Sequence, residues 1–172
     1  MRKKILILGS NDELSYAERM SMALSERFSN EPLDFECVLW NNPLIWKNGS
    51  TTLPSLIDMA IELKREGGFV LAVFTPDDVV ELRGKSQFCS RDNVWLEYGL
   101  FVGMLGISHV FAMCPQNTVT KAGKELDWRK PSDFQQYSLF YQYKDKADDA
   151  NLELRGLATI IVDKIKKALR SA

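Results

Sequence analysis

Short apolar runs separated by longer amphipathic stretches are the main pattern of this chain. The runs at residues 4–8 and 69–74 predict strands, the second of them apolar throughout and typical of a strand buried on both faces of a parallel sheet. Residues 34–40 alternate between apolar and polar side chains, which predicts another strand. Residues 109–114 and 138–143 add a fourth strand and a short fifth.

The stretches between these runs have helical spacing. Ser10 and Glu13 have the spacing of a capping box and precede the first helix. Its apolar face consists of Leu14, Ala17, Met20, Leu24 and Phe28. A second helix is expected from about residue 53 to 66, where Gly67 and Gly68 end it.

A third helix follows a polar loop that runs from the central strand to Ser90. Asp92 is expected to cap this helix and Gly106 to end it. A last helix is predicted near the C-terminus, with apolar side chains at Leu154, Leu157, Ile161, Ile165 and Ala168.

Strands that alternate with helices predict a parallel sheet covered by helices on both faces. We therefore expect an α/β, flavodoxin-like, three-layer fold with a five-stranded parallel sheet. The length of 172 residues, 45% of them hydrophobic, suits one domain with a sizeable core. Residues 1–145 would form this domain, and residues 146–172 a helix that completes it and can lead to a further domain.

In such sheets, ligands bind beyond the carboxyl ends of the strands. That edge is expected to gather residues 9–11, the loop around Trp46, the pair Asp77 and Asp78, and residues 91–97. His109, the only histidine, starts its strand and would lie at the opposite edge. Catalysis by a serine or cysteine with a histidine is therefore not expected.

Charge and cysteine content exclude several classes of function. Lys and Arg total 22 against 23 Asp and Glu, so no net field attracts nucleic acid or an anionic membrane. The N-terminus lacks a signal-peptide core, and no apolar stretch is long enough to span a bilayer, which favours a cytoplasmic protein. Three widely spaced cysteines indicate neither a disulfide framework nor a metal site.

Glu97 is the one formal charge in the apolar helical stretch from residue 94 to 105. Asn93 precedes it by four residues and projects from the same helical face, near an N-terminus that favours anions. One alternative is that Glu97 only pairs with Arg83 or Arg91. Its expected place at the ligand-binding edge favours a functional role instead.

A single carboxylate restricts the chemistry that is available. Hydrolysis of ordinary glycosides uses two carboxyl groups, one of which protonates the leaving oxygen. NAD differs because its nicotinamide is already a cationic leaving group. One carboxylate, Glu97, would then suffice to stabilise or attack the ribosyl oxocarbenium. Trp46, Trp95 or Tyr98 would offer a stacking surface for a flat base.

The sequence around Glu97 also resembles a known family. Residues 91–103, RDNVWLEYGLFVG, resemble the RDNVxxExGLFxG signature of bacterial TIR-like (Toll/interleukin receptor-like) domains, which are joined to STING-like or other cyclic-nucleotide sensors in anti-phage defence. The segments at 7–10 (ILGS), 74–78 (FTPDD) and 130–134 (KPSDF) resemble further parts of that family in the expected order. The resemblance spans about the first 140 residues.

This resemblance implies a TIR-type fold and an NAD glycohydrolase that releases nicotinamide and ADP-ribose, or a cyclic form, and depletes NAD in an infected cell. The catalytic glutamate would be Glu97, with NAD as substrate and no separate cofactor. The loop at residues 41–52 would shape the pocket and contact a neighbouring subunit, because these domains become active on assembly into homo-oligomers or filaments. A sensor domain or sensor chain for a cyclic nucleotide is expected as partner.

Substrate contacts are predicted for residues at the carboxyl edge, namely Gly9, Ser10, Trp46, Asp78, Arg83, Arg91 and Asn93. Either Asp77 or Asp78 would bind ribose hydroxyls. The two arginines would hold the pyrophosphate or neutralise Glu97 and these aspartates. The serine can equally be only a helix cap.

The position of tryptophan near Glu97 departs from a pattern found in related enzymes. Related enzymes with a Trp-x-x-x-Glu motif have tryptophan where this chain has Asn93, and its tryptophan is Trp95. Trp46 is therefore the preferred candidate.

Three other functions fit parts of the sequence. A nucleoside deoxyribosyltransferase uses a similar sheet and a glutamate at an anomeric carbon. A phosphoacceptor receiver module would bind magnesium and accept phosphate at Asp12, Asp77 or Asp78, and would give Glu97 no task. A third is a TIR domain that only assembles and has no catalytic activity.

Overall fold

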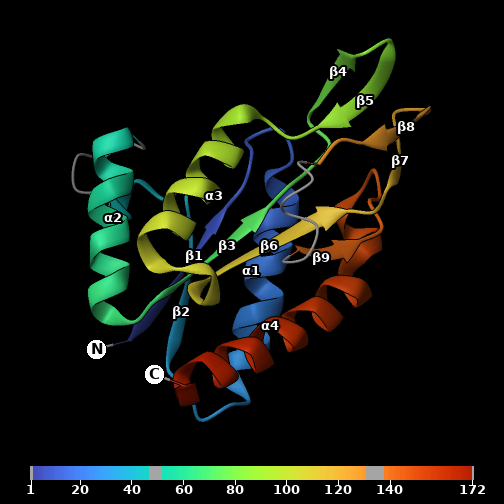
Figure 1. The fold of residues 1–172 in the computed structure, drawn as a ribbon. Coiled ribbons are helices and arrows are strands. Elements are labelled where there is room, and N and C mark those ends of the chain that lie inside the picture. The colour runs from blue at the N-terminus through green and yellow to red at the C-terminus, as the bar shows by residue number, and fades with distance from the viewer. Residues whose placement is uncertain (1, 47–51, 131–137, 172) are drawn as a thin grey trace.

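A five-stranded, all-parallel sheet forms the centre of the molecule (Figure 1). The computed structural model describes residues 2–46, 52–130 and 138–171. Strand order is β2-β1-β3-β6-β9, the order of a flavodoxin-like sheet, so the predicted fold class is confirmed. The strands are β1 (Lys3–Leu8), β2 (Phe35–Leu39), β3 (Phe69–Val73), β6 (Val110–Pro115) and β9 (Ser138–Tyr141).

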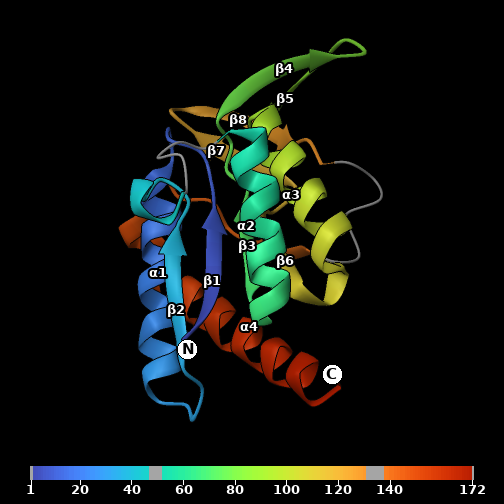
Figure 2. The same cartoon turned by 90° about the vertical axis from the view of Figure 1, so that its left-hand side faces the viewer.

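Helices cover both faces of this sheet, as Figure 2 shows from the side. Helices α1 and α4 pack together on one face, and α2 and α3 pack together on the other. The helices are α1 (Leu14–Ser29), α2 (Leu53–Glu66), α3 (Asp92–Leu105) and α4 (Asn151–Ser171), with short 3-10 turns at Pro43–Ile45, Ile107–His109 and Ala147–Ala150. Strands β3 and β6 are buried throughout, because helices shield them from both sides.

A second sheet of four strands lies beyond the carboxyl edge of the first (Figure 1). The prediction of a plain polar loop up to Ser90 is therefore wrong. Its strands, in the order β4-β5-β8-β7, are β4 (Asp78–Leu82), β5 (Lys85–Cys89), β8 (Lys124–Trp128) and β7 (Thr118–Lys121). Two tight hairpins build this sheet, and each uses a Gly as one of two turn residues with positive φ, at Arg83-Gly84 and Ala122-Gly123.

Helix boundaries agree with the sequence where the signal is local. Helix α2 has the predicted bounds, and Gly67 ends it in the left-handed conformation with φ of 66°. Helix α1 begins at Leu14, with Glu13 rather than Ser10 at its N-cap position. Helix α3 has Arg91 at its N-cap position, so Asp92 lies in the first turn and does not cap the helix as predicted.

The two edges of the large sheet have different contents. At the amino edge, His109 stacks on Phe69 with 4.8 Å between ring centroids, as expected for a histidine outside the ligand-binding edge. At the carboxyl edge, the loop after β1, the end of β3 and the start of α3 come together. None of the helices in the described part of the chain combines the length and hydropathy needed to span a bilayer.

Candidate active site

The site is built around Glu97, in the second turn of α3. The helix buries one face against the sheet through Val94, Tyr98 and Phe101. Glu97 is buried with them and is 6% exposed. A buried glutamate is rare unless it has a partner or a function. Asn93, one turn earlier, is exposed.

The carboxylate of Glu97 has no hydrogen bond or ion pair within the residues that the structure describes. Its removal from water is the one cause of its altered acidity, and it raises the pKa to about 7 from the ordinary 4.5. Burial therefore disfavours the ionised form of Glu97 and brings its pKa close to neutral pH.

Neither Arg83 nor Arg91 neutralises Glu97. Arg91 forms an ion pair with Asp12 and a longer contact, 3.8 Å from Nε to Oδ2, with Asp78. Arg83 lies at the exposed turn of the β4–β5 hairpin, five paired residues away from the sheet edge. The alternative in which Glu97 belongs to a structural ion pair with either arginine is therefore wrong.

A second carboxylate, Asp77, joins three chain segments at the same edge. Its Oδ1 accepts hydrogen bonds from the hydroxyls of Ser10 at 2.6 Å and Thr75 at 2.9 Å. Its Oδ2 accepts one from the backbone N–H of Arg91 at 3.2 Å. Partial burial raises the pKa of Asp77 above its ordinary value, while these hydrogen bonds lower it.

Ser90 ties the residue before Arg91 to the end of β3. Its hydroxyl accepts a hydrogen bond from the backbone N–H of Thr75 at 2.9 Å and donates one to the carbonyl oxygen of the same residue at 2.6 Å. Both side chains are almost fully buried. Because one hydroxyl satisfies both backbone groups of Thr75, the start of α3 is held close to the central strand.

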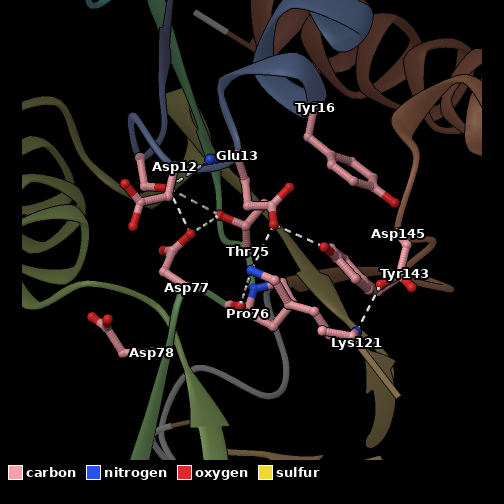
Figure 3. A network of polar contacts seen from close by, with 12 residues as sticks. Asp12, Glu13, Tyr16, Thr75, Pro76, Asp77, Asp78, Lys121, Tyr143 and Asp145 are labelled. Atoms are coloured by element: carbon pink, nitrogen blue, oxygen red, sulfur yellow. Dashed lines mark hydrogen bonds and ion pairs between the residues drawn. The ribbon is translucent and has the colours of Figure 1, made fainter. Parts of the chain in front are cut away.

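A third polar cluster connects the small sheet to α1 (Figure 3). Lys121 in β7 donates to the carbonyl oxygen of Pro76 at 2.8 Å and forms an ion pair with Glu13 at 2.6 Å. The same oxygen of Glu13 accepts a hydrogen bond from Tyr143 at 2.8 Å. Figure 3 places Asp78 apart from this network. The cluster fixes the backbone immediately before Asp77.

Most of the predicted binding residues that can be placed lie at this edge. Gly9 is buried, and a Cβ there would lie 3.3 Å from that of Ala17, which explains the close approach of α1 to β1. The hydroxyl of Ser10 donates its short hydrogen bond to Asp77. Its oxygen also accepts a long one, 3.4 Å, from the backbone N–H of Glu13 near the start of α1. Arg83 is the predicted residue that the structure separates from the rest.

Trp46, Trp95 and Tyr98, the predicted stacking surfaces, all pack into the interior of the protein. Trp46 is 5% exposed, and its indole N–H donates to the carbonyl oxygen of Trp40 at 2.7 Å. Trp95 stacks on Phe74 with 3.9 Å between centroids. Tyr98 is fully buried. The aromatic partner of a flat ligand stays a prediction, and residues 47–51 of the loop after β2 lie outside the described residues.

Sequence reasoning missed the residues that organise the edge. Ser90 and Lys121 carry no motif of their own, and Thr75 is known only as one residue of the 74–78 segment. The contacts of Ser90 and Lys121 with Thr75, Pro76 and Glu13 join residues 15 to 108 positions apart. The one usable signal is a run of polar residues directly after the apolar central strand. Of the KPSDF segment at 130–134, only Lys130 falls within the described residues. No group of three or more metal-binding side chains occurs among the described residues.

Comparison with known sequences identifies the family. Residues 4–135 match the family described as "CAP12/Pycsar effector protein, TIR domain". This chain belongs to that TIR-domain family. The matched region contains every strand of both sheets except β9 and the first residue of β1, as well as Glu97 and Asp77.

Individual relatives agree with the family match. CD-NTase-associated protein 12 of Flavobacterium daejeonense is 34% identical over 113 residues, which are 66% of this chain and 32% of the relative. Pycsar effector protein XpPycTIR of Xanthomonas perforans is 31% identical over 132 residues, 77% of this chain and 37% of the relative. The chain spans about a third of the length of these curated relatives, so they contain sequence beyond the TIR domain.

Proposed function

We propose that this TIR domain is an NAD glycohydrolase, with Glu97 as the catalytic residue. The observation that supports this most directly is a buried carboxylate without a cationic partner at the carboxyl edge of the sheet, within the described residues. Burial of an ionisable group costs free energy, and an active site is where such an arrangement is useful.

The proposed reaction begins with cleavage of the bond between nicotinamide and the ribose. The electron pair of this bond leaves with nicotinamide, which departs neutral, and the ribose carbon becomes an oxocarbenium. Ionised Glu97 stabilises this cation, or adds to it to form a glycosyl ester, and no general acid is needed. Water then adds to the same carbon and releases a proton, which gives ADP-ribose; addition within the molecule instead gives a cyclic form.

Burial of Glu97 supports the electrostatic part of this mechanism. A charge shielded from water interacts more strongly with a cation that develops nearby, because the effective dielectric constant is lower. The same burial disfavours the ionised form, as the pKa of about 7 indicates. About half of the carboxylates would be ionised at neutral pH, and a cationic nicotinamide ring nearby would increase that share.

The role proposed for the domain in the cell is that of an anti-phage effector that depletes NAD. Its family and relatives are CAP12 and Pycsar effectors, whose names link them to CD-NTase and Pycsar systems. We infer that self-assembly activates this domain and that a cyclic nucleotide, bound by a sensor on another segment or chain, triggers the assembly.

The decisive experiment compares wild type with Glu97→Gln after artificial clustering through a fused multimerising tag. Nicotinamide and ADP-ribose are measured by chromatography after incubation with NAD. Wild type should release nicotinamide, and the variant should lose activity by at least about 100-fold. Glu18→Gln, the same change at an exposed position of α1, is the matched control and should keep full activity.

The outcomes separate the alternatives. Base exchange on deoxynucleosides without consumption of NAD would indicate a deoxyribosyltransferase. Labelling by acetyl phosphate with magnesium would indicate a receiver module. A clustered wild type that leaves NAD intact and shows neither activity would leave the assembly function alone, and full activity of Glu97→Gln would refute the catalytic assignment.

A further inference from the structure

Asp77 accepts hydrogen bonds from the three segments that form the carboxyl edge. Ser10 belongs to the loop after β1, Thr75 to the end of β3, and Arg91 to the start of α3. Positions 67 residues apart are thus joined through one side chain. Few side chains could do this, since only a carboxylate accepts several hydrogen bonds at two separate oxygens without donating any.

The hydrogen bond from Arg91 to Asp77 lies at the N-terminus of α3, where backbone N–H groups lack partners within the helix. The first N–H groups of a helix have no partner within the helix, and here the side chain at the N-cap position supplies none. Asp77 provides an acceptor for the N–H of Arg91, and its negative charge suits the positive end of the helix dipole. Ser90, the residue before Arg91, is itself hydrogen-bonded to the backbone of Thr75.

Fixing the start of α3 also fixes the position of Glu97. Arg91 and Glu97 are six positions apart, which is about 9 Å along a helix at 1.5 Å per residue. The intervening Val94 is buried against the sheet, so the first turns move as one body. A shift of about 1 Å at the helix start would reach the carboxylate almost undiminished, and such a shift can reduce catalysis strongly.

We propose that Asp77 is a positioning residue, which holds the start of α3 against the ends of β1 and β3 and thereby places Glu97 for reaction. This inference rests on the proposed function of Glu97. Asp77 does not contact the substrate in this role, because its oxygens already accept three hydrogen bonds from the protein. It differs in this respect from Asp78, which is exposed and is predicted to contact the substrate.

Asp77→Asn tests the arrangement with little change in shape. Its side-chain amide is uncharged and has one acceptor oxygen. In one orientation the NH2 group faces the N–H of Arg91, and in the other it donates to the hydroxyls of Ser10 and Thr75 while the oxygen keeps only a weaker, neutral hydrogen bond to Arg91. Hydrogen exchange of backbone amides in residues 91–95 should therefore become at least about tenfold faster than in wild type. Asp34→Asn, the same change at an exposed carboxylate near the opposite edge, should leave exchange there unchanged. Unchanged exchange in Asp77→Asn would overturn the proposal.

Steady-state kinetics of the clustered protein distinguish positioning from substrate contact. In Asp77→Asn, kcat for NAD should fall at least about tenfold while KM stays within about twofold. A raised KM with unchanged kcat would instead identify a substrate contact and refute the positioning role. If wild type consumes no NAD, the proposed function fails, and the exchange experiment still decides whether Asp77 holds α3.

A second pair of variants covers the case in which Asp77→Asn does not fold. Thr75→Val removes one hydroxyl donor to Asp77 at nearly constant volume, whereas Thr75→Ser keeps it. The backbone groups of residue 75 that bind Ser90 are present in both. Exchange at residues 91–95 should be faster in the valine variant than in the serine variant, and equal rates would contradict the proposal.

Discussion

Arg91 pairs with Asp12 across the carboxyl edge and leaves Glu97, on its own helix, without a cation within the described residues. The helix geometry explains this choice. Arg91 is exposed at the N-cap position, whereas Glu97 lies about a turn and a half further along, on the buried face. The guanidinium therefore reaches the loop after β1 more readily than a carboxylate under its own helix.

Replacing Glu97 by Gln should stabilise the fold at alkaline pH. The folded-state pKa of about 7 lies above the ordinary 4.5, so between these values the folded protein binds more protons than the unfolded chain. The buried, ionised carboxylate therefore destabilises the folded state fully above pH 7. Below pH 4.5, where the group is protonated in both states, it has no such effect. The gain for Glu97→Gln should approach about 3 kcal/mol at pH 8.5, at most, and vanish near pH 4.

Urea unfolding at both pH values measures this effect. Glu18→Gln is again the control, because the same change at an exposed site should shift stability equally little at both pH values. A Glu97→Gln variant that is less stable than wild type at pH 8.5 would show that the carboxylate has a stabilising partner.

Activity should rise with pH through a midpoint near 7. Only the ionised carboxylate of Glu97 can stabilise a cation, and burial raises its pKa to about 7. The profile of kcat/KM for NAD reports this value for the free enzyme. Light scattering at each pH checks that the clustered state persists. A midpoint near 4.5 would mean that Glu97 is hydrated in the active assembly.

Replacing Arg91 should affect substrate binding more than stability. Its guanidinium is exposed and its ion pairs are accessible to water, so Arg91→Met should lower the melting temperature by no more than about 2 °C. If the guanidinium also binds the pyrophosphate of NAD, KM should increase about tenfold while kcat changes little. Arg91→Lys keeps the charge and should recover part of the loss. An unchanged KM in Arg91→Met would assign the residue to its two aspartates alone.

Ser90→Ala should destabilise the protein by about 1–3 kcal/mol. The change leaves the backbone N–H and carbonyl oxygen of Thr75 without their present partner in a buried place. Ser29→Ala, which removes an exposed hydroxyl that donates to the carbonyl oxygen of Glu26, should cost less than about 0.5 kcal/mol. Denaturant unfolding of both variants measures the difference, and equal losses would show that the two-way contact of Ser90 is unimportant.

The large sheet and its helices were predictable because their signals are local. An apolar run such as residues 69–74 or an amphipathic stretch with a terminal glycine such as residues 53–67 is readable without its neighbours. Strand order then follows from the preference for simple right-handed connections in alternating α/β chains. Glu97 was found for the same reason, because one charge in an apolar helix is visible in the sequence alone.

The small sheet was not predictable from such signals. Strands β4 and β5 are mostly exposed, so burial imposes no alternation of apolar and polar side chains on them. The Arg83-Gly84 turn is also less distinctive than an Asn-Gly or Asp-Gly turn. Arg83 was therefore expected near the substrate and instead lies at the end of a hairpin.

The sequence by itself determined the fold class, the edge of the sheet at which most candidate residues lie, and the one carboxylate that stands out chemically. It did so through periodicity and composition, which depend on neighbours along the chain. Only the tertiary structure decided that Arg91 forms an ion pair with Asp12 and that Asp77 joins three segments of the edge by hydrogen bonds. These contacts join residues up to 79 positions apart, and a polar side chain acquires its partners only when packing brings such segments within hydrogen-bond distance.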